Sequence, residues 1–386
     1  MWRVDGGRAV FGVKRLMSIY RQSRHPLVRW WWEMDRVAVA VIVVIMLCGA
    51  VAVTTASVAV AKSYNVGPYH FAVRHYLFLL LALGVMLGMT TLKPEGVKRT
   101  GFLLFIGAFV GILLTFVIGT EVKGARRWID IAGQSIQPTE FMKPALILVT
   151  AALLASHDKR KQLQGYFASI VMMGAVGLPV LMQPNFGMAL AMGLVWFLQV
   201  FMAGLPLLWL APVVAGGLCV VVGAYTMLPH VRDRLERFIN PEHSDTYQVD
   251  QANEAIMMGH LWGRGAGEGV VKHQLPDAHT DFIFAVVAEE FGIVVGLLLM
   301  GLFLTLVLRG FSRVLAQEDR FVLLGVGGLL TLISIHVCVN IGVALHLVPT
   351  TGMTLPFISY GGSSTFAMAL VLGFLLALLR KQGKRI

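Results

Sequence analysis

"VAVAVIVVIMLCGAVAVTTASVAV", Val37 to Val60, is an uncharged apolar run that is long enough to cross a lipid bilayer as one helix. A spanning helix needs about 20 predominantly apolar residues. The rest of the 386-residue chain has the same character, because 57% of its residues are hydrophobic and only 14% are charged. A soluble domain would carry roughly a quarter charged residues. The sequence therefore predicts an all-α integral membrane protein that crosses the bilayer many times.

Ten such runs follow one another, separated by polar breaks such as "KPEGVKR", "SHDKRKQ" and "RGFSRVLAQEDR". The stretch "AGLP", with Gly204 and Pro206, leaves open whether the sixth and seventh runs are two helices or one kinked helix. The predicted transmembrane helices cover residues 37–60, 75–92, 101–119, 139–155, 166–183, 187–203, 206–228, 282–308, 321–346 and 355–379.

The distribution of Lys and Arg sets the orientation, because cytoplasmic loops of membrane proteins carry an excess of both. With a cytoplasmic N-terminus, 21 of the 32 lie inside and ten outside, and Lys143 lies within a helix. We therefore expect a basic cytoplasmic segment at 1–36, a membrane domain at 37–380 and a basic cytoplasmic tail at 381–386. Both termini are then cytoplasmic, and the net charge of +11 suits anionic lipid rather than nucleic acid.

One long external loop, residues 229–281, connects the seventh and eighth helices and is expected to hold short helices. It ends in "LPDAHTDFIFAVVAEEFG", Leu275 to Gly292, which places Asp281 at the boundary between water and lipid. A carboxylate there is well placed as a general base, since partial burial raises its proton affinity. The alternatives are that Thr280 or Asp281 simply caps the eighth helix, or that His279 is the base.

Ionisable groups inside membrane helices are candidates for function by default. Glu140 and Lys143 lie three residues apart on one helical face and can pair, either as a structural pair or as part of a polar cavity. Glu289 and Glu290 diverge by about 100° on a continuous helix. We therefore expect one of them to meet a cation such as Lys143 in the bundle.

A second external loop, "EVKGARRWID", brings three cations together at the outer interface. Lys123, Arg126 and Arg127 lie beside Trp128, and an arginine pair suits bidentate binding of a phosphate. A lipid phosphate is the favoured anion. Ordinary contact with lipid headgroups is the alternative.

Four stretches together resemble the SEDS family (shape, elongation, division and sporulation proteins), which includes RodA and FtsW. These are "GARRWIDIAGQSIQPTEFMKP", "QPNFGMAL", "LPDAHTDFIFAVVAEEFG" and "VPTTGMTLPFISYGGSS", in the family's order along the chain. The last stretch, with Thr354, is more similar to the FtsW branch than to the RodA branch. The chain departs from the family pattern at His260, Ala344 and His346.

The resemblance implies a ten-helix peptidoglycan glycosyltransferase that polymerises lipid II during septal wall synthesis in cell division. It implies that Asp281 is the essential external aspartate and that Glu140 and Lys143 are the family's buried polar pair, with Glu289 and Glu290 supporting the polar interior. The expected substrate-binding residues are Arg74, Lys123, Arg126, Arg127, Trp128, His279 and Ser363.

The expected partners are lipid II, undecaprenyl pyrophosphate, a class B penicillin-binding protein of the FtsI type and other division proteins, in the bacterial inner membrane at the septum. A divalent cation such as Mg²⁺ is a further expectation, although the sequence shows no ligand cluster that identifies a metal. A RodA-type elongation polymerase, a lipid II flippase and a non-catalytic division scaffold are the rival functions.

Overall fold

The computed structural model describes residues 26–380 except 123, 132, 206, 241–245 and 316. Each of the ten predicted apolar runs coincides with a long helix. The sixth and seventh runs are two separate helices, α8 and α9. The helices are α3 (Arg36–Ala61), α4 (His70–Met89), α5 (Pro94–Ile118), α6 (Pro138–Leu154), α7 (Lys159–Met182), α8 (Phe186–Met202), α9 (Leu207–Met227), α12 (Ile283–Val314), α13 (Arg320–Ala344) and α14 (Gly362–Leu379).

The chain is a multi-pass membrane protein. Seven of the helices in the described part are long and apolar enough to cross a membrane: α3, α4, α5, α7, α12, α13 and α14. An eighth is obtained if the bent pair Val214–Met227 and Val231–Ile239, which meet at 96°, counts as one span. A short helix, α2 (Pro26–Glu33), precedes α3.

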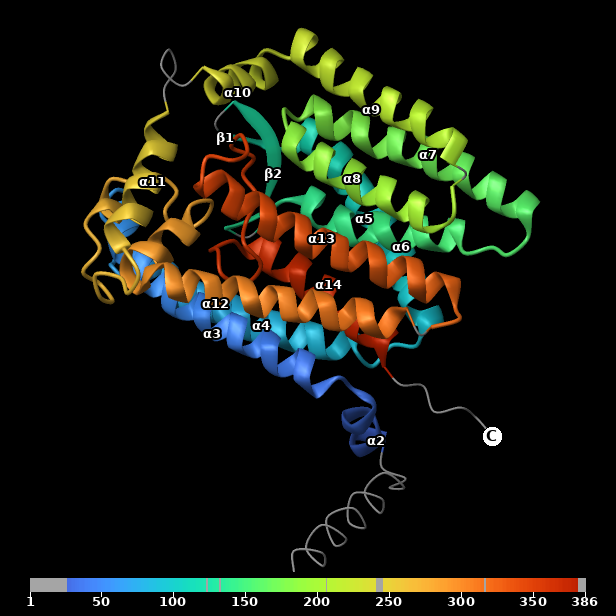
Figure 1. Ribbon diagram of the computed structural model, residues 1–386, viewed down its shortest axis with the longest axis horizontal. Coiled ribbons are helices and arrows are strands. Elements are labelled where there is room, and N and C mark those ends of the chain that lie inside the picture. Colours follow the sequence, from blue (N-terminus) through green and yellow to red (C-terminus); the bar gives the residue numbers. More distant parts are fainter. Residues whose placement is uncertain are drawn as a thin grey trace, which may run out of the picture.

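The centre of the bundle is formed by α13 and α14 (Figure 1). In the most apolar window of α14, 89% of the residues are buried, against 22% in α5 at the periphery. A helix that is apolar on every face belongs in an interior, and α14 accordingly packs against α4, α6 and α13. The exposed leucines and valines of the outer helices are the surface that lipid covers in a membrane protein.

The prediction of an all-α fold is wrong between α5 and α6. A three-stranded antiparallel sheet lies there, with β1 (Thr120–Val122), β2 (Ala125–Ile131) and β3 (Gln134–Ile136) in that order. Gly124 and Gly133, with φ of 74° and 75°, make the two tight turns, a conformation that glycine adopts without steric strain. The loop that carries the predicted cations therefore forms this sheet.

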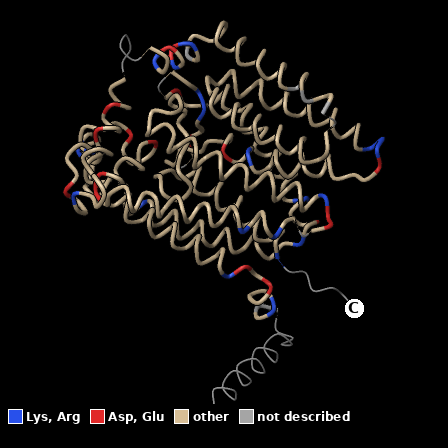
Figure 2. Tube along the Cα trace, in the orientation of Figure 1, with Lys and Arg blue, Asp and Glu red and all other residues tan. Residues whose placement is uncertain are grey.

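The external loop 229–281 contains short helices, as predicted. These are α10 (Pro229–Ile239), α11 (Tyr247–Gly259) and the 3₁₀ turn η2 (Val271–His273). They lie at the same end of the bundle as the sheet (Figure 1), which we call the loop end. The opposite end, where α3 begins and α14 ends, is the terminal end. Figure 2 shows that most charged residues lie at these two ends.

The eighth helix is not continuous. Gly292 has φ 83° and ψ 164°, so α12 consists of a front segment, residues 283–291, and a longer rear segment, residues 293–314. The prediction of one regular helix over 282–308 missed this break. At the terminal end, the rear segment is fixed to the start of α3, because Arg309 and Arg313 both pair with Asp35, at 2.7 and 3.0 Å.

Candidate active site at the loop end

Asp281 lies at the loop end, directly before α12, with a partly exposed side chain. Its backbone carbonyl accepts a hydrogen bond from Asn340 Nδ2 at 2.9 Å, and the same amide donates to the carbonyl of Met353 at 2.7 Å. The N-cap of α12 is Phe282, whose side chain makes no capping bond. The N-cap position of this helix is therefore not occupied by Thr280 or Asp281.

Among the described residues, Arg234 of α10 is a cation on which the charge of Asp281 acts, and the prediction from sequence missed it. Burial lowers the pKa of Arg234, the negative charge of Asp281 raises it, and the charge of Arg237 lowers it further. The guanidinium also donates to the carbonyl of Thr350 at 3.4 Å. Burial and the charge of Arg234 in turn lower the pKa of Arg127 to about 10. Asp281, Arg127 and the two arginines of α10 come from three separate segments and are close enough for their charges to interact.

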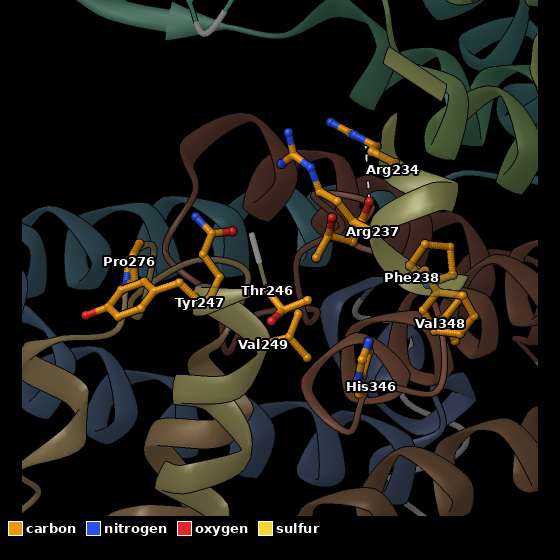
Figure 3. Close-up of a pocket in the computed structure, with 12 residues that line it drawn as sticks. Arg234, Arg237, Phe238, Thr246, Tyr247, Val249, Pro276, His346 and Val348 are labelled. Atoms are coloured by element: carbon orange, nitrogen blue, oxygen red, sulfur yellow. Dashed lines mark hydrogen bonds between the residues drawn. The ribbon is translucent and has the colours of Figure 1, made fainter. Parts of the chain in front are cut away.

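Arg234 and Arg237 line a cavity of about 310 Å³ (Figure 3), and Asp281 is not among its lining residues. Arg234 and Arg237 lie next to each other at one edge of the cavity, and Tyr247 and Pro276 lie at the opposite edge. A guanidinium pair at the edge of a polar cavity is suited to bind a phosphate or pyrophosphate group.

A narrower cleft of about 90 Å³ adjoins the cavity and is lined mainly by apolar side chains. Arg234 lines both spaces, and so do Val348, Pro349 and Thr350. The polar and apolar spaces therefore meet at one arginine, an arrangement that matches a ligand with an anionic head and an apolar tail. The apolar side chains come from α8 (Leu190, Leu194), α10 (Val231, Leu235) and α13 (Ile335, Val339).

Two of the cations predicted on the β1–β3 loop, Arg126 and Arg127, bond to other protein groups. Arg126 is exposed and pairs with Glu121 at 3.4 Å. Arg127 is half-buried, and its guanidinium donates to the carbonyl of Gln183 at 2.8 Å and to that of Pro184. Arg127 thereby fixes the sheet to the turn between α7 and α8. Trp128 pairs with β1 in the same sheet, and Lys123 lies outside the described residues.

His279, the rival base, is buried among aromatic rings. Its ring lies 4.8 Å from that of Phe71 and 5.4 Å from that of Tyr360, between centroids. Burial raises the pKa of Tyr360, against a hydrogen bond and the positive charge of Arg74. Arg74 thus lies at the loop end beside this aromatic cluster. His279 therefore packs against these rings, and its predicted roles as a base or in substrate binding stay predictions.

Ser363 connects the start of α14 to the sheet and to α6. Its hydroxyl accepts a hydrogen bond from the N–H of Gln137 at 3.0 Å and donates to the carbonyl of Ser135 at 3.3 Å. These bonds give Ser363 a structural role, and its predicted contact with substrate stays a prediction.

The comparisons with known proteins agree with this architecture. The model of the cell cycle protein family named for FtsW, RodA and SpoVE matches residues 35–384. The chain belongs to this family. A "Probable peptidoglycan glycosyltransferase FtsW" of Caulobacter vibrioides is 37% identical over 363 residues, covering 94% of this chain and 93% of the relative. The protein of the same name from Coxiella burnetii is 34% identical, covering 89% and 96%.

Solved structures of the FtsW/RodA/SpoVE family share the fold. The RodA of Thermus thermophilus superimposes with a TM-score of 0.67 at 27% identity, covering 91% of this chain and 98% of RodA. A chain from the work "Structural coordination of polymerization and crosslinking by a peptidoglycan synthase complex" superimposes with a TM-score of 0.74 at 28% identity, covering 90% and 98%.

The predicted pair of Glu140 and Lys143 is present in the interior. Lys143 Nζ lies 2.8 Å from Glu140 Oε2, as the spacing predicts, and both residues are buried. Lys143 also donates to His336 Nε2 at 2.8 Å, and Nδ1 of that ring lies 3.1 Å from the carbonyl oxygen of Thr354. The sequence did not single out His336, because one histidine in an apolar run carries no partner signal of its own.

Glu290 meets a cation, as expected, but that cation belongs to the external loop and is not Lys143 in the bundle. Glu290 pairs with Lys272, and the Glu289 carboxylate accepts from backbone N–H groups of the same loop. The two glutamates therefore hold the external loop and not the centre of the bundle. Of the positions that depart from the family pattern, His346 packs edge-on against Phe238 at 5.5 Å and lines the cavity.

No group of three or more His, Cys, Asp or Glu residues lies together in the described ranges in a way that could hold a metal ion. The cluster of Asp281 with Arg127, Arg234 and Arg237 offers one carboxylate beside three arginines, which is a poor set of ligands for Mg²⁺. These residues do not fit a resident divalent cation. A cation that arrives with a substrate stays a prediction, and no step below depends on it.

Proposed function

We propose that this protein polymerises lipid II into glycan strands and that Asp281 is the general base. Asp281 takes the proton from the 4-hydroxyl of the acceptor sugar, and the oxygen attacks the anomeric carbon of the donor. The bond from that carbon to the pyrophosphate breaks, and undecaprenyl pyrophosphate leaves. The base and the leaving group then flank the carbon on opposite faces, so the configuration inverts.

One observation carries this proposal: Arg234 interacts with Asp281 and lines both the polar cavity and the apolar cleft. A pyrophosphate at Arg234 and Arg237 would have its negative charge neutralised as the glycosidic bond breaks. Its prenyl chain would enter the cleft between α8, α10 and α13. The acceptor sugar would then occupy the cavity on the side of Asp281.

The topology that we propose has ten crossings with both termini in the cytoplasm. The ten long helices support it, and so does the excess of Lys and Arg at the terminal end, since that end then faces the cytoplasm. The cavity and Asp281 would face outwards, where lipid-linked sugars are available. The inner membrane of a bacterium, at the division septum, is the location that this topology and the FtsW-named relatives favour.

The partner that we propose is a class B penicillin-binding protein of the FtsI type, together with other division proteins. The structural neighbour from a synthase complex that couples polymerisation and crosslinking supports this choice. The names of the curated relatives favour the division branch over the elongation branch.

The test is to purify the protein with its penicillin-binding partner, supply fluorescent lipid II and separate the products by size. We expect glycan strands from the wild type and almost none from Asp281→Asn, with the complex intact. Asp250→Asn, an exposed change on α11, is the matched control and should polymerise normally. Lipid II translocation in vesicles without any polymer would favour the flippase, and neither activity would favour the scaffold.

A further inference from the structure

The break in α12 raises the question of what holds Asp281 in place. The front segment carries Asp281 just ahead of it, and Gly292 separates it from the rear segment. At Gly292 the helical hydrogen-bond ladder stops, so the rear segment does not by itself fix the direction of the front segment. Every residue of 283–290 is buried, which excludes solvent but leaves the backbone groups at the break in need of partners.

The external loop supplies those partners. Residues 260–265 cross the break and replace the missing ladder with four backbone hydrogen bonds. The approach is so close that a Cβ on Gly292 would lie 2.2 Å from the carbonyl oxygen of Leu261, and one on Gly263 would lie 2.2 Å from that of Glu290. The four bonds are Arg264 N–H to Glu289 O (3.0 Å), Gly265 N–H to Glu290 O (3.0 Å), Ile293 N–H to His260 O (3.1 Å) and Val294 N–H to Leu261 O (3.4 Å).

The side chains of Glu289 and Glu290 add further bonds from the helix to the loop. Glu289 Oε1 accepts from the N–H groups of Val270 and Val271 at 2.6 and 2.7 Å, and Oε2 accepts from that of Lys272 at 3.0 Å. Glu290 pairs with the ammonium group of Lys272, which also donates to the carbonyl of Gly267 at 3.2 Å. Lys272, Glu289 and Glu290 are 2%, 0% and 1% exposed. We call these three residues and the loop 260–272 the clasp.

The clasp fixes one end of the front segment, and the bond from Asn340 Nδ2 to the carbonyl of Asp281 holds the other end. The helical part of the segment, residues 283–291, is about 14 Å long at about 1.5 Å per residue. A pivot of about 4° at Gly292 would therefore displace Asp281 by about 1 Å. A displacement of this size can reduce the rate of a positioned reaction about 100-fold.

We propose that Lys272 and Glu290 are positioning residues that hold the front segment of α12, and through it Asp281, at the place where it meets the acceptor hydroxyl. This rests on the proposed function of Asp281 and adds to it. The buried ion pair acts on the base from the far end of the segment, without touching the substrate.

The test uses Lys272→Met, Glu290→Gln and the double variant, in the purified complex with its penicillin-binding partner. Lys272→Met leaves a buried carboxylate without its cation, whereas the double variant removes both charges. The matched control is Arg232→Met/Glu236→Gln, which removes an exposed ion pair on α10 in the same loop, with side chains 60% and 43% exposed. Initial rates against lipid II concentration give kcat and KM, and hydrogen exchange is followed over residues 283–294.

We expect the double variant to regain most of the thermal stability that Lys272→Met loses, while its kcat stays about 100-fold below the wild type. KM should change less than about 3-fold, because the pair does not bind the substrate. Exchange over 283–294 should be faster in all three clasp variants and unchanged in the control. Glu290→Gln, which keeps the shape of the side chain, should retain the fold and lose about 10-fold in kcat.

Recovery of kcat together with stability in the double variant would overturn the proposal, because the pair would then only balance charge. Wild-type kcat and wild-type exchange in Glu290→Gln would overturn it as well. If the wild type itself makes no polymer, the proposed function fails. The exchange measurement does not depend on that result and still reports whether the clasp holds the front segment.

Discussion

Replacing Lys143 by Met tests what the buried pair of α6 does. Lys143 Nζ lies 2.8 Å from Glu140 Oε2. At an effective dielectric constant of about 20, two unit charges at that distance attract by about 6 kcal/mol. Taking both groups out of water costs several kcal/mol for each ion, so the net contribution of the intact pair is small. Removal of one partner is different, because it leaves a charge buried alone and costs about 3–5 kcal/mol.

Lys143→Met should therefore lower the apparent Tm of the detergent-purified protein by about 6–10 °C, at about 2 °C for each kcal/mol in a chain of this size. The double variant Lys143→Met/Glu140→Gln should recover to within about 2 °C of the wild type. If the pair is only structural, the double variant also polymerises lipid II normally per folded molecule. A double variant as unstable as the single one would refute the reasoning, since charge imbalance would not be the cause of the loss.

Three further predictions concern the two ends of the bundle. Arg234→Ala should raise KM for lipid II and Kd for undecaprenyl pyrophosphate about 10–100-fold, because a charge-assisted hydrogen bond is lost. If isothermal titration gives the same Kd for the variant and the wild type, the assignment is wrong. Arg127→Ala should destabilise the fold by about 2–3 kcal/mol, because its guanidinium bonds to two carbonyls, while Arg126→Ala leaves the melting temperature unchanged. Burial would raise the pKa of Asp35, but the hydrogen bond from Arg309 and the other positive charges outweigh it and lower the pKa. Asp35 therefore stabilises the fold above about pH 4, and the difference in stability between the wild type and Asp35→Asn should shrink as the pH falls below that value; a difference independent of pH would contradict this.

The spans could be read from the sequence because lipid forces every backbone group to be satisfied within its own helix. Long apolar runs such as Val37–Val60 carry that signal locally. The pair of Glu140 and Lys143 was also predictable from neighbours along the chain, because both residues lie on one turn of one helix. Where a feature depends only on neighbours along the chain, the sequence was sufficient.

Features that depend on distant partners could not be read in this way. The expectation that Glu289 or Glu290 meets a cation such as Lys143 assumed a regular helix, whereas the external loop bonds to both glutamates beside the break at Gly292. The glycine run Gly263–Gly269 permits close approach of two backbones, but the backbone that it approaches lies about 25 residues further along the chain. Arg234 gave a weaker signal still, because an arginine on a short amphipathic helix is ordinary until the fold places it beside Asp281.

The central claim is that Asp281 removes a proton from the acceptor hydroxyl. The most direct measurement is the pH dependence of kcat/KM for glycan polymerisation. It is made on the wild type and on Asp281→Asn, with equal amounts of folded protein. A general base must be deprotonated, so the wild-type rate should fall on the acid side of its profile, and the residual rate of Asp281→Asn should lose that acid limb. An acid limb that persists unchanged in Asp281→Asn would show that another group is the base.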